Sequence, residues 1–326
     1  MKNSVKAFLT DSLYWLYIWG GISYLLSRWE IFSLSPLWVI ILGFISAIGL
    51  IFTHKSLGFI SYNKTDYKFF KSLFGWEVIF LLVLTFVIGW NVVEINLYKF
   101  FFQFKNAGGI LSGLFHPNFE ILTPMLKALA ETIYLALLAT VFAVPFAFVL
   151  SFFAARNLMP RTLVGNTLYI IVRTIATFFR SVEALVWAII FTVWVGIGPF
   201  AGMLALMIHS VASLTKLYSE QIENIDKGPV EAIMATGAST LQIWTYAVIP
   251  QIISPYLAFT IYRWDINVRM ATIVGFVGGG GIGLALMQQQ QLLRWHNVGL
   301  IIWLIALIVW IMDMMSAKIR QKLLNN

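Results

Sequence analysis

A series of long apolar segments constrains the fold of this chain more than any other feature. A helix that crosses a bilayer needs about 20 mainly apolar residues. Eight segments fit, near residues 13–27, 37–53, 74–91, 126–153, 182–197, 200–218, 252–275 and 297–316. Backbone polar groups in lipid must be satisfied within each segment, so helices are expected, and a barrel would show short alternating strands instead. The sequence therefore predicts an all-α integral membrane protein, a polytopic helical bundle.

Composition supports this prediction and excludes several kinds of site. Hydrophobic residues make up 60% of the 326 residues and charged residues 11%, against about 25% charged residues in soluble domains. The absence of cysteine excludes disulfides, thiolate metal sites and a cysteine nucleophile. The net charge of +8 comes mostly from residues between the apolar runs, as expected of topology determinants. We therefore expect a lipid bilayer and no nucleic acid as a partner.

The basic residues predict the orientation. With the N-terminus inside, Arg28, Lys99, Lys105, Lys127 and Arg294 lie outside or at the outer edge. The cytoplasmic set is larger: Lys2, Lys6, Lys55, Lys64, Lys68, Lys71, Arg156, Arg161, Arg173, Arg180, Lys216, Lys227, Lys318, Arg320 and Lys322. This bias predicts a multi-pass protein of the cell membrane with both termini in the cytoplasm. The first apolar run has the length of a signal-peptide core but lacks a small-residue cleavage site, which favours a retained helix.

Three connections differ from short loops. Residues 92–125 are predicted to form an outer loop whose aromatic side chains lie at the interface. Residues 163–179 are apolar but interrupted by Asn166, Arg173 and Thr174, which favours a helix lying along the cytoplasmic face. Residues 219–250 form a long cytoplasmic stretch of mixed polarity.

The stretch from Gly228 to Pro250 is predicted to form two short helices with a break between them. Pro229 suits a first helical turn, Glu231 lies near the positive end of the helix dipole, and Gly237 can end the helix in a left-handed conformation. Ser239 or Thr240 can cap the second helix, which Pro250 is expected to end. Such an element suits docking in a groove on a partner.

This loop resembles the cytoplasmic loop of ABC importer permeases. Glu231, Ala232, Gly237 and Pro250 match that family's pattern in identity and spacing. Ile233, Ala247 and Ile249 depart from it but remain apolar. The resemblance implies a coupling helix that sits in a cleft of the ATP-hydrolysing subunit and transmits its closure to the membrane helices. The bland alternative is an ordinary connector between two helices.

Residues 126–322 resemble the permeases of phosphonate importers more closely. The similar blocks are Glu131-Thr132, Ala154 to Asn157, Phe179 to Ala188, Gly196 to Gly202, Tyr262 to Arg269 and Gly275 to Gly283. The resemblance implies a type I ABC importer permease core with additional N-terminal helices. We expect N-terminal helices and an outer loop in residues 1–120, and the permease domain in residues 121–326 with its coupling loop at 219–250.

Three charged residues fall within one predicted span. Such charges usually face the bundle interior or a water-filled cavity. Asp265 and Arg269 are four residues apart and can pair, while Arg263 lacks an obvious neighbour. One interpretation is a structural network that holds helices together. The other is an arginine lining the path of an oxyanion, because its planar fork matches phosphoryl oxygens.

The glycine run 275–283 lacks the terminal Gly-Lys-Ser/Thr of a phosphate loop, so nucleotide binding is not expected. Glycines beside a membrane helix permit either a broken backbone facing a cavity or close helix packing. Gly278, Gly279, Gly280 and Gly281 are the candidate gate.

No catalytic residues, metal site or cofactor are predicted. His54, His116, His209 and His296 are scattered without metal-ligand spacing, and no paired carboxylates or Ser/His/Asp arrangement stands out. The associated complex, rather than this subunit, is expected to hydrolyse ATP.

The resemblance implies a machine that works by alternating access. Its partners are two ATP-hydrolysing subunits, a second permease copy forming a homodimer, and an extracytoplasmic binding protein that delivers a phosphonate or similar oxyanion. Phosphite or an amino acid is an alternative solute. A secondary transporter would typically show a repeated half with matching broken helices, and an intramembrane enzyme would need a catalytic constellation.

Overall fold

The computed structural model describes residues 2–51, 56–63, 69 and 73–324. Lys55, Lys64, Lys68 and Lys71, and the end of the predicted 37–53 segment, lie outside the described residues. The chain divides into two compact units, an N-terminal unit of residues 1–104 and a C-terminal unit of residues 105–326. The described residues are helical wherever they have regular structure, which confirms the predicted fold class.

The N-terminal unit is a helical bundle centred on α1. Its helices are α1 (Lys2–Arg28), α2 (Pro36–Ile51), α3 (Leu57–Asn63), α4 (Leu73–Val92) and α5 (Leu97–Phe102). Two buried acids hold the start of α3: Asp11 accepts from the Gly58 amide (2.6 Å) and Glu77 accepts from the Leu57 amide (2.7 Å). The first amides of a helix have no partner within it, so these carboxylates from α1 and α4 tie the three helices together.

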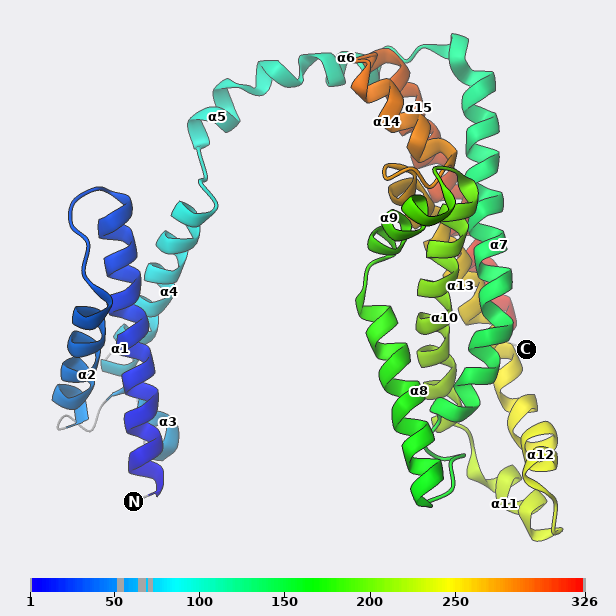
Figure 1. Ribbon diagram of the computed structural model, residues 1–326, viewed down its shortest axis with the longest axis horizontal. Coiled ribbons are helices and arrows are strands. Elements are labelled where there is room, and N and C mark those ends of the chain that lie inside the picture. Colours follow the sequence, from blue (N-terminus) through cyan, green and yellow to red (C-terminus); the bar gives the residue numbers. More distant parts are fainter. Residues whose placement is uncertain (1, 52–55, 64–68, 70–72, 325–326) are drawn as a thin grey trace. The chain divides into compact units, whose positions relative to one another are not determined.

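The C-terminal unit contains the long helices. They are α6 (Gly108–Phe115), α7 (Leu122–Ala154), α8 (Leu163–Ser181), α9 (Ala184–Val195), α10 (Pro199–Glu223), α11 (Lys227–Ala235), α12 (Thr240–Ile243), α13 (Ile249–Gly275), α14 (Gly281–Gln291) and α15 (Trp295–Leu324). Helices α7, α10 and α13 run side by side through this unit (Figure 1). Alanines line their contacts, among them Ala136, Ala139, Ala201, Ala205 and Ala271. Small side chains let helix backbones approach closely in a membrane.

Each of the eight apolar segments contains a helix within its described residues. Among the residues that the structure describes, four helices are long and apolar enough to cross a membrane: Phe74–Val92, Phe119–Ala154, Pro199–Glu223 and Trp295–Leu323. A fifth span is possible if α8 and α9, which meet at an angle of 86°, form one broken crossing.

Helices α8 and α9 differ from the prediction. Residues 163–179 were expected to lie flat on the cytoplasmic face, with 182–197 crossing the membrane. Instead α8 runs along α10 (Figure 1), and α9, with 12 residues, is only about 18 Å long. Arg173 of α8 faces the bundle, as shown below, whereas Thr174 is exposed.

Part of the outer connection packs against the C-terminal helix. A Cβ on Gly299 would meet the Gly113 carbonyl, and a Cβ on Gly113 would meet the Trp295 carbonyl. The Trp303 indole donates to the Leu114 carbonyl (2.8 Å). Residues from Lys105 onward therefore belong with the C-terminal unit, although the sequence suggested a boundary near residue 120.

Candidate functional site

The glycine run is held by two residues of α7. The Gly281 amide donates to a Glu131 carboxylate oxygen (2.9 Å), and the Ile282 amide donates to the Thr132 hydroxyl (2.8 Å). These are the first amides of α14, which have no partner inside that helix. Glu131 also places a negative charge at the positive end of α14. The Glu-Thr pair and the glycine run, read separately in the sequence, thus form one structure.

The candidate gate glycines are buried in tight packing. Gly278, Gly280 and Gly281 have φ of 94°, 78° and 66°, in the left-handed region that favours glycine. The Gly278 carbonyl accepts from the Gly198 amide (2.8 Å). A Cβ on Gly279 would strike Val274 and Gly202. The run therefore interlocks with the connection between α9 and α10, and close packing accounts for these glycines in this conformation.

Arg263 lies in a buried polar cluster between α10 and α13. Its guanidinium Nε donates to the Ser210 hydroxyl (3.0 Å), and a terminal nitrogen donates to His209 Nδ1 (2.6 Å). Asn267 donates to both Ser210 (2.8 Å) and Thr140 of α7 (2.9 Å). The residue that lacked a neighbour in the sequence thus has partners more than fifty positions away. Its guanidinium group is thus hydrogen-bonded to side chains of the neighbouring helix α10.

Asp265 and Arg269 face a different helix. Arg269 binds Asp265 (2.5 Å), as the four-residue spacing suggested, and also Asp313 of α15 (2.5 Å). The Asp265 side chain is only 2% exposed, so the pair takes one charge out of solvent and links α13 to α15. The three charged candidates are therefore not one site, because Arg263 contacts α10 and the other two contact α15.

The cytoplasmic loop has the predicted local structure up to residue 243. Asp226 caps α11 by accepting from the Gly228 amide (3.0 Å). Gly237 follows the helix with φ of 78°, which ends it in the left-handed conformation that glycine favours. Ser239 then begins α12 with a reciprocal capping box that involves Gln242. Each of these signals acts between residues a few positions apart.

The prediction that Pro250 ends a helix is wrong. Residues Trp244–Val248 form a π-helical turn that continues directly into α13 at Ile249, so Pro250 lies in the first turn of α13. Proline is tolerated there because its missing N–H would have no partner in any case. Because the π-helical turn runs directly into α13, the chain remains helical past Pro250.

The predicted coupling residues are open to a partner. Glu231, Ala232, Gly237 and Pro250 are all exposed, and Met234 and Leu241 present large apolar side chains on the same loop. Gln251 ties the two ends of the loop together by accepting from the Asp226 amide (3.0 Å). The loop is thus a preformed surface of helix ends and apolar side chains anchored to α10 and α13.

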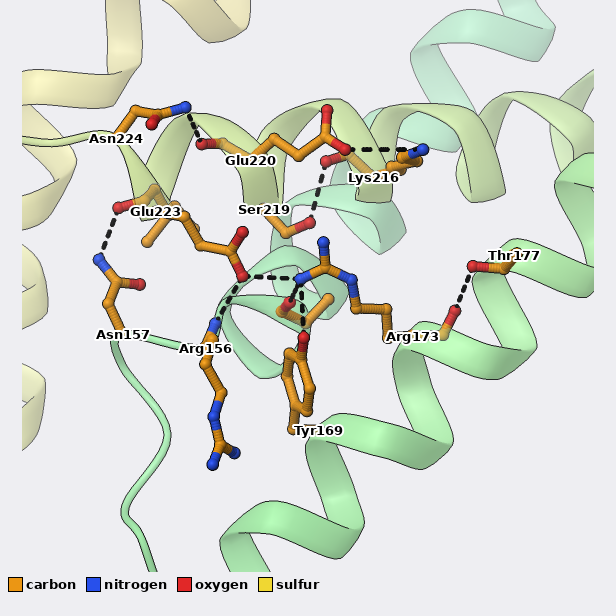
Figure 2. A network of polar contacts seen from close by, with 12 residues as sticks. Arg156, Asn157, Tyr169, Arg173, Thr177, Lys216, Ser219, Glu220, Glu223 and Asn224 are labelled. Atoms are coloured by element: carbon orange, nitrogen blue, oxygen red, sulfur yellow. Dashed lines mark hydrogen bonds and ion pairs between the residues drawn. The ribbon is translucent and has the colours of Figure 1, made fainter. Parts of the chain in front are cut away.

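A polar cluster that the sequence did not predict joins α8 to the root of this loop (Figure 2). One Glu223 carboxylate oxygen accepts from the Arg173 guanidinium (2.7 Å) and the Arg156 amide (2.9 Å), and Arg173 also binds the Tyr169 hydroxyl (2.9 Å). Asn157 donates to the Ile222 carbonyl (2.7 Å). The polar interruption at Arg173 was the signal that could have revealed it.

Within the described ranges, no three His, Asp or Glu side chains gather as metal ligands. This part of the chain contains broken and closely packed helices, charged side chains inside the bundle and an exposed loop suited to docking. These features are typical of a transport pathway whose conformation a partner protein changes.

Comparison with known proteins agrees with this geometry. Residues 147–321 match the family described as binding-protein-dependent transport system inner membrane component. HtxC of Stutzerimonas stutzeri, named for phosphite transport as a permease protein, is 33% identical over 262 residues that cover 80% of this chain and 91% of that protein. PhnE2 of Escherichia coli strain K12, named as a cryptic phosphonate transport system permease protein, is 41% identical over 119 residues, which are 36% of this chain and 98% of that protein.

A solved structure is similar in fold. An inward-facing structure of the MetNI methionine ABC transporter matches with a TM-score of 0.54 at 22% identity, over 63% of this chain and 99% of that chain. The similarity at this identity speaks for the fold alone, and the fold agrees with the family match over more than half of the chain. This chain belongs to the family of binding-protein-dependent transport system inner membrane components and is a permease subunit of an ABC importer.

Proposed function

We propose that this permease carries a small phosphorus oxyanion, phosphonate or phosphite, across the cell membrane. The observation that carries the proposal is the similarity of 80% of the chain to a permease named for phosphite transport, at 33% identity. The matched region also covers 91% of that protein, so the similarity extends over nearly its whole length. The chain's similarity to PhnE2 supports phosphonate as the second member of the same chemical class.

The exposed loop is the docking surface for the ATP-hydrolysing subunits. Its Glu231 and Met234 side chains are free to meet a groove on a partner, and the Glu223 cluster links its root to α8. Groove binding of short helices depends on such apolar anchors. Two identical permease copies, two ATPase subunits and an extracytoplasmic binding protein complete the proposed complex.

Both termini lie in the cytoplasm in this proposal. Within the C-terminal unit, Arg156 and Arg161 lie in the connection between α7 and α8, and Lys227 begins α11 of the docking loop. Lys127 lies in the first turns of α7, and Arg294 lies directly before α15. An excess of basic residues marks the cytoplasmic side, and it agrees with an ATPase docking there.

Within the bundle, we assign Arg263, Asp265 and Arg269 to holding helices together, since each is occupied by side chains of neighbouring helices. Gly278, Gly279, Gly280 and Gly281 remain the candidate gate. Their contacts with Gly198 and Gly202 join the segment to the α9–α10 connection. A movement that opens the path at this level would have to separate these backbones.

The test is transport by the complete complex in proteoliposomes. The permease is purified with its ATPase subunits, reconstituted, and supplied with the binding protein, ATP and radiolabelled phosphite, methylphosphonate, phosphate or methionine. We expect ATP-dependent uptake of phosphite or methylphosphonate, with ATP hydrolysis stimulated by the same solute. Uptake of methionine alone would overturn the substrate assignment, and failure of any ATPase subunit to co-purify would overturn the docking assignment.

A further inference from the structure

A polar pocket lies between α8 and α10 and shares only His209 with the polar clusters described above. Its lining residues are Arg180, His209, Ser213, Lys216, Leu217 and Glu220, and its volume is about 310 Å³. This is large enough for a small oxyanion with some of its water, and it falls at the lower end of typical ligand pockets.

The α10 side of the pocket is a stripe at helical spacing. His209, Ser213, Lys216 and Glu220 follow one another at intervals of four, three and four residues, so they share one face of the helix. A stripe of this polarity within a membrane span is costly against lipid and usually faces the bundle interior or a water-filled cavity. The stripe therefore favours a bundle interior or a water-filled cavity on this side of α10.

Two cations border the pocket without being committed to structural pairs. Lys216 meets Glu220 at 3.6 Å, and both side chains are about two-fifths exposed, at 40% and 43% (Figure 2). Arg180 is exposed, and among the described residues no carboxylate lies within ion-pair distance of it. Loose pairs at exposed positions contribute little stability, so both groups can turn toward an anion at small cost.

The wall formed by His209 is fixed in one protonation pattern. An arginine guanidinium can only donate, so the contact with Arg263 makes His209 Nδ1 an acceptor. The proton of the neutral ring is then on Nε2. His209 thus links the buried Arg263 to the pocket that Arg180 also lines.

Three other arginines of the C-terminal unit are not available for this task. Arg263 is 6% exposed and bound to Ser210 and His209. Arg269 is shared by Asp265 and Asp313, and Arg173 is held by Glu223 and Tyr169. Among these five described residues, Arg180 and Lys216 alone are available cations that border an open volume.

We propose that this pocket is a transit site for the oxyanion, with Arg180 and Lys216 as its binding groups and Ser213 as a hydroxyl donor. The inference rests on the proposed function. The planar guanidinium group of arginine and the ammonium group of lysine both form charge-assisted hydrogen bonds with phosphoryl oxygens. Glu220 competes with the anion for Lys216, which keeps binding weak. Weak binding suits passage, because a solute must be able to leave as readily as it enters.

The position of Arg180 couples this site to a bend in the chain. Arg180 is the residue before the last of α8, directly ahead of the 86° turn into α9. Lys216 lies on the unbroken helix α10. A change in that angle would alter the separation of the two cations, so the affinity of the pocket would vary between conformations of the permease.

The experiment uses the reconstituted complex and compares Arg180→Gln and Lys216→Gln with the control Arg161→Gln. Arg161 is an exposed arginine at the cytoplasmic end of the C-terminal unit and does not line this pocket. We expect either pocket variant to raise the KM for phosphite or methylphosphonate about 10-fold to 100-fold, as for loss of one charge-assisted hydrogen bond. ATP hydrolysis without solute should stay at the wild-type level, and Arg180→Lys should recover part of the affinity.

The outcomes separate the two proposals. If the wild-type complex carries neither oxyanion, the proposed function fails. If it carries one and both pocket variants have the KM of Arg161→Gln, the transit site is refuted. A pocket variant that loses assembly, seen by size exclusion, is replaced by Arg180→Lys and Lys216→Arg. Wild-type KM values for Ser213→Ala and for both conservative variants would also refute the site.

Discussion

The cap that α7 places on α14 gives a prediction of defined size. Thr132→Val removes the hydroxyl that accepts from the Ile282 amide and keeps the shape of the side chain. Thr132 is 1% exposed and Ile282 is fully buried, so the amide gains no water in exchange. The Ala128 carbonyl loses the donor of the same hydroxyl (2.9 Å) but lies within α7.

The expected loss is the cost of one buried unpaired amide, about 1–3 kcal/mol in the free energy of unfolding. Helix caps measured one at a time contribute a similar amount, roughly 0.5–2 kcal/mol, and the two figures describe the same bond. For a unit of this size the melting temperature falls by about 2–4 °C per kcal/mol. Thr132→Val should therefore lower it by about 2–12 °C.

The control is Thr215→Val. Thr215 is also completely buried in a long helix, and among the described residues its hydroxyl has no hydrogen-bond partner. The same substitution there should leave the melting temperature unchanged or raise it. Thermal unfolding in detergent, with hydrogen exchange at the Ile282 amide, measures both effects. Equal melting temperatures for the two variants, or unchanged protection of that amide in Thr132→Val, would refute the cap.

Four further predictions follow from the same contacts. Arg269→Met should lower the free energy of unfolding by about 3–5 kcal/mol because it leaves Asp265 buried and unpaired. Asp313→Asn should lower it much less, and equal yields of monodisperse protein from the two variants would contradict this. Gly280→Ala should lower the free energy of unfolding by at least about 1–2 kcal/mol because of its left-handed backbone, and further because the new Cβ would contact Pro199. The control Gly89→Ala, with open space around it, should fold normally. Gly237→Ala should weaken retention of the ATPase subunits in affinity purification without lowering the melting temperature of the permease by more than a few degrees, and unchanged retention would argue against the loop as the docking surface. Glu223→Gln should cost about 1 kcal/mol, since its partner Arg173 is partly exposed, and should speed proteolysis of residues 156–162, with no change in cleavage rate as the contrary result.

Features encoded by neighbouring residues were predictable from the sequence. The left-handed Gly237 and the cap at Ser239 depend on chain chemistry within a few positions, and their positions in the structure are as expected. Asp265 and Arg269 pair across one helical turn for the same reason. Hydropathy likewise located each long helix, because burial in lipid acts on every residue of a segment.

Features set by distant residues or by a single bend were not predictable. Arg263 finds His209 across 54 positions, and nothing in its own helix indicates that partner. Hydropathy averaged over a whole span does not detect the 86° turn near Val182, so α8 was assigned to the wrong environment. At Pro250 the general rule that proline stops a helix failed, because a π-helical turn precedes it and the proline falls in a first turn.

The contacts of Glu131 and Thr132 also bear on how the protein is made. Their partners lie 150 residues later in the chain, so α7 enters the membrane long before α14 has been synthesised. During that interval the Glu131 carboxylate and the Thr132 hydroxyl have no α14 amide to accept from. The cap of α14 is therefore a late event in synthesis, and a chain that stops before Gly281 never forms it.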